Sequence, residues 1–372
     1  MKRLLIISGN TNSIVWFRLD LVKDFMSEGY EVYALTPESN NETEKELKSY
    51  GINYIKIKLE RKSFNVINLI KGIYDIKQNI DKLNPEIVIS YMHKSIIASS
   101  LAVALSRKNI RVFSIISGLG HLFERSDLKH RLLGFISSFL LKLSFQFNKK
   151  VFFQNPDDKN LFENSNLLNS DKAILVNGSG VNIKKFSYSE IPHQTVFMTM
   201  ARLLESKGLR EFAESAKVVK EKFPETRFII YGYPDKHSDS ISEKEILNLW
   251  SVKYGTEYLG YTEEPSAAYD AASVFVLLSY REGVPRTVLE AMAKSRPIIT
   301  TDVPGCRETV VDGLNGYLVP PRNIIKASEA MINLVDRNKQ IIMGAKSRSI
   351  AEEKFDVRKV NEIILKEVLH KT

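Results

Sequence analysis

Two glutamates, Glu282 and Glu290, stand eight residues apart directly after the apolar run 273–279. The run predicts a buried parallel strand, and a helix is expected to begin near Pro285, whose missing N–H suits a first helical position. Gly283 allows a ligand to approach the backbone closely, and the positive end of the helix favours an anion such as a diphosphate. Because carboxylates repel phosphate, we interpret Glu282 as an acceptor for the hydroxyls of a transferred sugar and Glu290 as an acceptor for a ribose. The candidate binding residues between them are Gly283, Val284, Pro285 and Arg286.

Two cations follow another predicted strand, at 196–200. Arg202 and Lys207 lie five residues apart in the loop after it. They could clamp a diphosphate as negative charge develops on a leaving group, and a solvated surface loop is the alternative. The chain contains no Asp-X-Asp pair, which metal-dependent transferases usually need. We therefore expect catalysis without a metal or other cofactor, in which these cations and the helix start do the work of a divalent ion.

Three loops in the N-terminal half also follow predicted strands. The first contains Gly9 and Asn10, which could contact a donor sugar or an acceptor, or simply form a turn between strand and helix. His93 follows the run 87–90, and His121 follows the run 112–116. Each histidine could act directly on substrate or be an ordinary packed residue. Ser117 and Gly118 open the loop that contains His121 and are further candidate binding residues.

These motifs resemble those of the family 4 retaining glycosyltransferases, which have the GT-B fold. The resemblance covers three separated stretches in the family's order, 198–208, 281–293 and 297–319. It implies that Arg202 and Lys207 hold the diphosphate of a UDP-linked donor. It also implies front-face displacement, in which the leaving diphosphate helps to deprotonate the incoming hydroxyl.

One position departs from the family pattern. Ser117 stands where many relatives carry a histidine before the glycine that matches Gly118. The run 118–120 and the His-Lys-Ser tripeptide at 93–95 instead resemble the subgroup that extends undecaprenyl-diphosphate-linked sugars, including N-acetylgalactosaminyltransferases.

Apolar runs alternate with amphipathic stretches along the whole chain, which predicts parallel sheets with crossover helices. The predicted strands are 4–7, 31–35, 54–56, 87–90, 112–116, 151–154, 196–200, 227–231, 257–259, 274–278, 298–300 and 317–319. A turn-rich segment at 177–182 predicts the join of two doubly wound Rossmann-like domains that face each other across a cleft. We expect an acceptor-binding domain at 1–182 and a nucleotide-sugar-binding domain at 183–356. By the resemblance, a last helix at 357–372 crosses back to the first domain.

The positive charge is unevenly distributed. The chain carries a net charge of +9, and residues 61–150 hold 15 basic and 5 acidic side chains. Such a region suits nucleic acid, an anionic membrane or a phosphorylated substrate. The stretch Leu128–Lys150 combines bulky apolar side chains with basic ones, as in a helix that lies on anionic lipid, although a buried helix with charged ends fits too. The single cysteine, Cys306, excludes an internal disulfide and fits a reducing cytoplasm.

We therefore expect a retaining, metal-independent hexosyltransferase that moves an N-acetylhexosamine or hexose from a UDP-sugar to a polyprenyl-diphosphate-linked saccharide in bacterial glycan assembly. It would work peripherally on the cytoplasmic face of the inner membrane, at an anionic surface, and would not bind nucleic acid. Tyr261 would lie near the nucleobase or in a surface turn. Two alternatives stay open: a sugar-nucleotide epimerase of the same architecture, and a non-enzymatic nucleic-acid-binding protein that uses the basic half. A nicotinamide-dependent oxidoreductase would need a glycine fingerprint that the first loop lacks.

Overall fold

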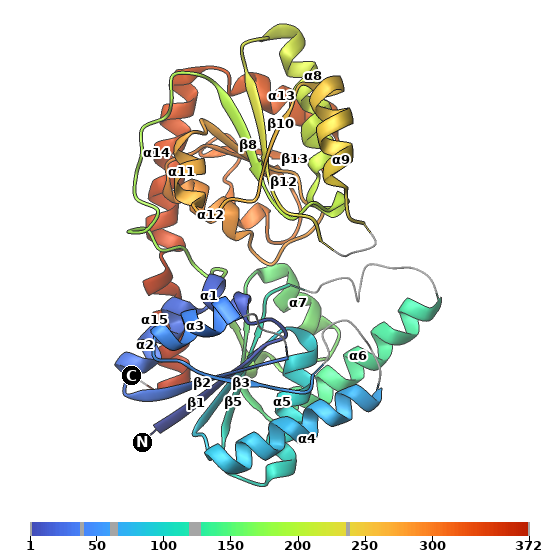
Figure 1. Ribbon diagram of the computed structural model, residues 1–372, viewed down its shortest axis with the longest axis vertical. Helices are drawn as coiled ribbons and strands as arrows, with labels where there is room; N and C mark the ends of the chain where they lie inside the picture. The colour runs from blue at the N-terminus through green and yellow to red at the C-terminus, as the bar shows by residue number, and fades with distance from the viewer. Residues whose placement is uncertain (1, 38–40, 60–65, 119–127, 236–238, 371–372) are drawn as a thin grey trace. The chain divides into compact units, whose positions relative to one another are not determined.

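Two parallel β-sheets organise the chain, and each carries helices on both faces (Figure 1). The computed structural model describes residues 2–37, 41–59, 66–118, 128–235 and 239–370, without the side chains of 128–133. The chain divides into unit 1, which runs to Ser179 and resumes at Val360, and unit 2, Gly180–Lys359. The expected domain boundaries, after residues 182 and 356, lie three residues from these division points. The predicted fold class of two doubly wound α/β domains is confirmed.

Unit 1 has a seven-stranded sheet in the order β3-β2-β1-β4-β5-β6-β7. Its strands are β1 (Lys2–Ile7), β2 (Tyr30–Thr36), β3 (Asn53–Lys56), β4 (Ile87–Tyr91), β5 (Arg111–Ile116), β6 (Asn148–Phe153) and β7 (Ala173–Leu175). Its helices are α1 (Asn12–Phe17), α2 (Leu19–Ser27), α3 (Asn41–Ser49), α4 (Val66–Leu83), α5 (His93–Ser106), α6 (Leu128–Gln146) and α7 (Pro156–Asn164), and α15 (Val357–Leu369) begins in unit 2 and packs here. A 3₁₀ turn, η2 (Ser170–Lys172), precedes β7.

Alternation along the strands builds two apolar layers in unit 1. Leu4 and Ile6 of β1 face a cluster with α1, α2, α3 and α15, whereas Leu5 and Ile7 face a cluster with α4 and α5. This is the period of two expected when both faces of a strand are covered. The last helix belongs to the first layer, since Val360, Ile364 and Val368 are buried there.

Unit 2 has a six-stranded sheet in the order β10-β9-β8-β11-β12-β13. Its strands are β8 (Val196–Met200), β9 (Arg227–Tyr231), β10 (Glu257–Gly260), β11 (Val274–Leu277), β12 (Ile298–Thr301) and β13 (Gly316–Val319). Its helices are α8 (Leu209–Lys222), α9 (Glu243–Glu245), α10 (Ser251–Tyr254), α11 (Pro265–Asp270), α12 (Arg286–Ala293), α13 (Ile324–Asn333) and α14 (Arg337–Lys354). Short turns are η3 (Glu205–Lys207), η4 (Ile246–Trp250) and η5 (Arg307–Thr309). One apolar cluster lies beneath α8, α10 and α13, and another lies beneath α11, α12 and α14.

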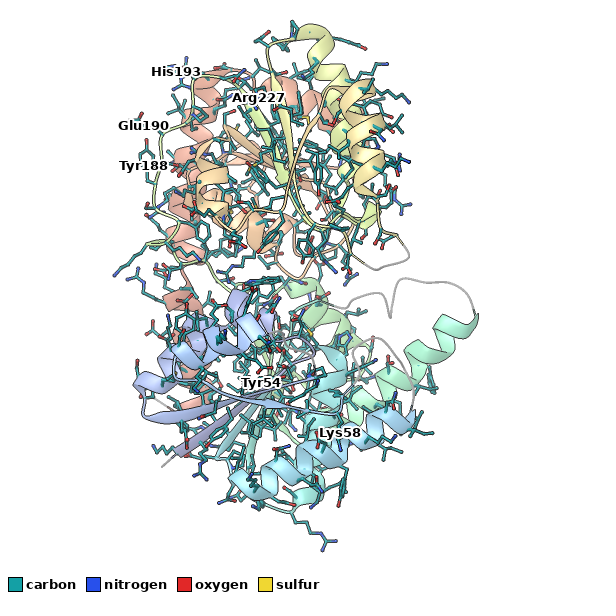
Figure 2. The ribbon with its side chains drawn as sticks, in the orientation of Figure 1. Tyr54, Lys58, Tyr188, Glu190, His193 and Arg227 are labelled. Atoms are coloured by element: carbon teal, nitrogen blue, oxygen red, sulfur yellow. The ribbon has the colours of Figure 1, made fainter. Side chains whose placement is uncertain are left out.

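The segment that enters unit 2 runs along the outside of α14, where Tyr188, Glu190 and His193 mark it in Figure 2. Buried Arg296 holds this segment, because its guanidinium donates to Ser189 O at 3.0 Å and to Glu190 O at 3.1 Å. The entering and leaving segments also pair, since Val181 N–H donates to Phe355 O and Val357 N–H donates to Val181 O.

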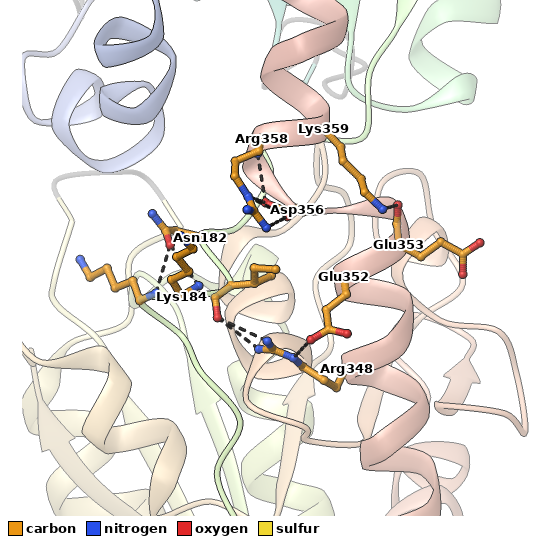
Figure 3. A network of polar contacts seen from close by, with 10 residues as sticks. Asn182, Lys184, Arg348, Glu352, Glu353, Asp356, Arg358 and Lys359 are labelled. Atoms are coloured by element: carbon orange, nitrogen blue, oxygen red, sulfur yellow. Dashed lines mark hydrogen bonds and ion pairs between the residues drawn. The ribbon is translucent and has the colours of Figure 1, made fainter. Parts of the chain in front are cut away.

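Ion pairs and hydrogen bonds to carbonyl oxygens reinforce the place where the entering and leaving segments of unit 2 pair (Figure 3). Arg348 donates to Phe186 O at 2.9 Å and to Glu352 at 2.6 Å. Buried Asp356 accepts from Arg358 at 2.5 Å. Side chains from α14 and the start of α15 therefore fix the backbone of unit 2 where the chain enters and leaves it.

Every strand predicted from the sequence coincides with an observed strand to within three residues. The predictions miss β7, a three-residue edge strand.

Candidate active site

The turn between β11 and α12 carries Glu282. Pro285 caps α12 in an extended conformation and the helix begins at Arg286, so the expectation of proline as the first helical residue is wrong by one position. Glu282 N–H donates to Pro304 O at 3.2 Å. A Cβ on Gly305, at φ +81°, would lie 2.3 Å from the carbonyl oxygens of Glu282 and Gly283. The loop after β12 therefore supports this turn through a contact that only glycine permits.

Glu282 makes an ion pair with Lys207. The Lys207 ammonium donates to Glu282 Oε1 at 2.5 Å, and Ser279 Oγ donates to the same oxygen at 2.7 Å. The side chains of Lys207 and Glu282 are 15% and 16% exposed. Two residues that the sequence assigned to different parts of a ligand thus contact each other.

The loop that carries Lys207 is packed directly against the end of β11. A Cβ on Gly208, at φ +67°, would lie 2.1 Å from Leu278 O. Tyr280 N–H donates to Ser206 O at 3.0 Å. Because β8 and β11 are neighbours at the point where the strand order reverses, this pair lies where open α/β sheets bind ligands.

Arg202 lies in the same loop but has a different partner. It donates to Asp235 Oδ2 at 2.6 Å, and its side chain is 38% exposed. Leu203 N–H donates to Tyr233 O at 3.0 Å, which ties the loop to the continuation of β9. Asp235 was not predicted as a partner of Arg202, because only the fold brings it near β8.

Glu290 is buried on α12 and accepts from two side chains. Arg286 Nε donates to Oε1 at 2.9 Å, and Tyr269 Oη donates to Oε2 at 3.1 Å. Of the other predicted residues of this turn, Gly283, Val284 and Pro285 are buried.

Tyr261 follows β10 and is 56% exposed. Its ring meets that of Tyr233 edge to face, with centroids 5.8 Å apart. Since β9 and β10 are neighbours, the two rings form an aromatic pair at the carboxyl end of the sheet. Tyr233 was not predicted as a site residue.

In unit 1, Gly9 is buried and Asn10 is half-buried in the loop after β1. Asn10 Oδ1 accepts from Asn12 N–H at 3.0 Å. Ser13 Oγ lies 2.9 Å from Tyr91 Oη, which links this loop to the end of β4. Asn10 is therefore held in an ordered loop at the neighbouring ends of β1 and β4.

His93 begins α5 at the end of β4. Its Nε2 is buried and has no hydrogen-bond partner in the described part of the chain. Burial lowers the pKa of His93 to about 4, so the imidazole is neutral at pH 7. Beyond β5, Ser117 is exposed and Gly118 has φ +122°. His121 lies outside the described residues.

Within the ranges that the structure describes, no three His, Cys, Asp or Glu side chains form a group that could hold a metal ion. Cys306, in the loop after β12, is buried, and burial raises the pKa of its thiol to about 12.

Both halves of the chain match transferase families. Residues 4–155 match the family described as glycosyl transferase 4-like, and residues 194–337 match glycosyl transferases group 1. An N,N'-diacetylbacillosaminyl-diphospho-undecaprenol alpha-1,3-N-acetylgalactosaminyltransferase from Campylobacter jejuni is 28% identical in an alignment of 368 residues that covers 95% of each chain. The capsular polysaccharide biosynthesis glycosyltransferase CapM of Staphylococcus aureus is 23% identical over 84% of this chain and 83% of its own.

Solved structures share the fold. Anabaena HepE in complex with UDP and glucose superimposes with a TM-score of 0.78 at 14% identity, over 100% of both chains.

Proposed function

The chain is a glycosyltransferase of the GT-B fold, with a glycosyl transferase 4-like domain followed by a group 1 domain, and on this basis we propose that it transfers a sugar from a UDP-sugar to a lipid-diphosphate-linked saccharide with retention of anomeric configuration. The observation that carries the proposal is the Lys207–Glu282 pair where the strand order of unit 2 reverses. The Campylobacter relative is named for an undecaprenol-diphosphate-linked acceptor, and the HepE structure contains UDP. The matched families give no support to an epimerase or a nucleic-acid-binding protein.

The donor diphosphate would lie between Lys207 and Arg202, whose charges stabilise the leaving group. When the diphosphate takes Lys207 as its partner, Glu282 becomes free to accept from a hydroxyl of the donor sugar. Glu290 would accept from the ribose, and the Tyr233–Tyr261 pair would contact the nucleobase. Gly283, Val284, Pro285 and Arg286 would shape the turn around the donor.

The proposed step is a front-face displacement. The acceptor hydroxyl oxygen bonds to the anomeric carbon while the bond from that carbon to the diphosphate oxygen breaks on the same face. The hydroxyl proton passes to the leaving diphosphate, so Glu282 forms no covalent bond. We propose that the cations of the β8 loop neutralise the diphosphate without a divalent ion, in keeping with the missing Asp-X-Asp pair.

Unit 1 would bind the acceptor along the ends of β1, β4 and β5. Gly9, Asn10, Ser117 and Gly118 lie there, and His93 begins the helix after β4. A neutral imidazole suits hydrogen bonding to a hydroxyl rather than pairing with phosphate. His121 completes the proposed acceptor residues.

The same unit carries a surface suited to lipid. No helix in the described ranges is long and apolar enough to cross a bilayer. However, α4 and α6, which lie along one side of unit 1 in Figure 1, expose large apolar side chains. These are Val66, Ile67, Ile70, Tyr74, Phe135, Ile136 and Phe139. With the net positive charge of residues 61–150, this apolar face would dock on the anionic cytoplasmic face of the inner membrane, near its lipid-linked acceptor.

A thermal-shift screen with UDP, GDP, ADP and UDP-sugars tests the donor. A nucleotide at 100 times its dissociation constant should stabilise the protein by about 2.7 kcal/mol. Transfer to a water-soluble diphosphate-linked acceptor, with the anomeric configuration of the product read by NMR, tests the reaction. Stabilisation by none of the nucleotides, or an inverted product, would overturn the proposal.

A further inference from the structure

Tyr269, near the end of α11, is a fully buried tyrosine whose hydroxyl reaches a candidate site residue. Its side chain has no exposed surface, and its ring packs against Phe186 and Phe275 with centroids 6.0 and 5.6 Å away. Its carbonyl accepts from buried Arg296 at 2.9 Å. Aromatic packing and a backbone hydrogen bond therefore fix where the hydroxyl lies.

That hydroxyl donates to Glu290 Oε2 at 3.1 Å, from 21 residues earlier in the chain. Burial and the nearby Glu290 carboxylate raise the pKa of Tyr269 well above its usual value, so the phenol remains a proton donor at any physiological pH. The other carboxylate oxygen, Oε1, accepts from Arg286 at 2.9 Å. Both oxygens of Glu290 are thus held, one by a residue of α11 and the other by the first residue of α12.

The two contacts leave lone pairs on a carboxylate that cannot rotate. An ionised carboxylate offers about four acceptor positions, and side chains in the described part of the chain occupy two of them here. A ligand hydroxyl that meets a carboxylate already fixed in orientation forms its bond without an added cost of ordering the side chain.

We infer that Tyr269 is a positioning residue for recognition of the nucleotide ribose, acting through Glu290. The inference rests on the proposed role of Glu290 and adds a residue that never contacts the ligand. In this inference Glu290 distinguishes a ribose from a deoxyribose, and the α11 tyrosine strengthens that discrimination by fixing the carboxylate.

Ribose selectivity provides the test. Dissociation constants for UDP, GDP and ADP, and for their 2′-deoxy and 3′-deoxy forms, are measured by calorimetry for wild type, Tyr269→Phe and Glu290→Gln. For the nucleotide that binds wild type, we expect a preference for the ribose form of at least about tenfold, since a hydrogen bond to a charged group is at stake. Tyr269→Phe keeps the ring packing and should reduce this preference by roughly fivefold, while Glu290→Gln should nearly abolish it.

A matched control separates positioning from stability. Tyr254→Phe removes another buried tyrosine hydroxyl of unit 2, which donates to Glu214 Oε1 at 3.5 Å, and should leave the preference unchanged. If Glu290→Gln loses the preference but Tyr269→Phe retains it at the wild-type value, the inference about Tyr269 is wrong and the role of Glu290 stands. If Glu290→Gln also retains it, or if no nucleotide binds wild type, the assignment of Glu290 to the ribose fails and the inference fails with it.

Discussion

Replacing Lys207 should both destabilise the protein and slow transfer, whereas replacing Arg202 should only slow transfer. Lys207 and Glu282 are joined at 2.5 Å, and each is about 85% buried, being 15% and 16% exposed. Removing one partner of a fully buried pair costs about 3–5 kcal/mol, and removing one partner of an exposed pair costs about 0–1 kcal/mol. Because Ser279 still donates to Glu282, we expect Lys207→Met to lower the free energy of unfolding by about 2 kcal/mol.

Arg202 provides the contrast. Its ion pair with Asp235 is 38% exposed on the arginine side, so Arg202→Ala should cost at most about 1 kcal/mol of unfolding free energy. Both variants should lose on the order of 100-fold in turnover, by analogy with the loss of one preorganised charge donor. Stability is measured by urea unfolding followed by circular dichroism, and turnover by UDP release in the presence of a soluble acceptor.

A double variant distinguishes the unpaired charge from lost packing. In Lys207→Met/Glu282→Gln an uncharged amide replaces the carboxylate, so at least about half of the stability lost in the single variant should return, while turnover stays low. A double variant no more stable than Lys207→Met would show that lysine packing, and not the ion pair, stabilises the turn. Near-normal turnover in both single variants would remove the diphosphate clamp from the mechanism.

Three further outcomes are expected. Transfer should survive excess EDTA, because cationic side chains neutralise the diphosphate; complete loss with rescue by Mg²⁺ or Mn²⁺ would contradict this. Burial lowers the pKa of His93 to about 4, so the unfolded chain binds more protons below pH 6.5 and stability falls as the pH drops from 6.5 towards 4. His93→Gln should therefore lose roughly 2 kcal/mol less unfolding free energy than wild type between pH 7 and pH 5 in urea titrations, and identical pH profiles would refute the shift. Changing the exposed Ile67, Ile70 and Phe139 together to Ser should weaken co-sedimentation with anionic liposomes by about 100-fold or more, without loss of stability. Ile325 is also exposed, on α13 of unit 2, and Ile325→Ser should bind liposomes like wild type. Wild-type binding by the triple variant would show that α4 and α6 do not contact lipid.

The elements that carry the site could be predicted because their local patterns are strong. The run 274–277 is apolar throughout and fully buried, and proline and glycine mark the turn after it. The edge strand β7 has only three residues, too few for a period to be recognised. The helix begins at Arg286, one residue after Pro285, and the sequence could not decide between the two because extended and helical backbone both accept the fixed φ of proline.

The partners of the site residues could not be predicted, because they come from distant parts of the chain. Asp235 reaches Arg202 from 33 residues away, and Tyr269 reaches Glu290 from 21. Only the order of the strands decides which loops become neighbours, and a single sequence does not reveal that order. Strand patterns and the residues that follow them could therefore nominate candidate side chains, while the hydrogen-bond partners of these side chains required the fold.

The Lys207–Glu282 pair offers an explanation of how a carboxylate could lie at the edge of the proposed diphosphate site. Without a ligand, a lone carboxylate beside a helix start and a phosphate site would leave negative charge half-buried and would repel the diphosphate. With Lys207 at 2.5 Å, the charge of Glu282 is compensated in the free protein. In the proposed mechanism, a diphosphate that binds Lys207 would replace one anionic partner with another. Glu282, still held by Ser279, would then offer its remaining lone pairs to a neutral sugar hydroxyl. UDP alone should then bind less tightly than a UDP-sugar, because only the sugar gives Glu282 a new hydrogen-bond donor. Equal dissociation constants for UDP and the UDP-sugar in wild type, unchanged in Glu282→Gln, would separate this glutamate from sugar recognition.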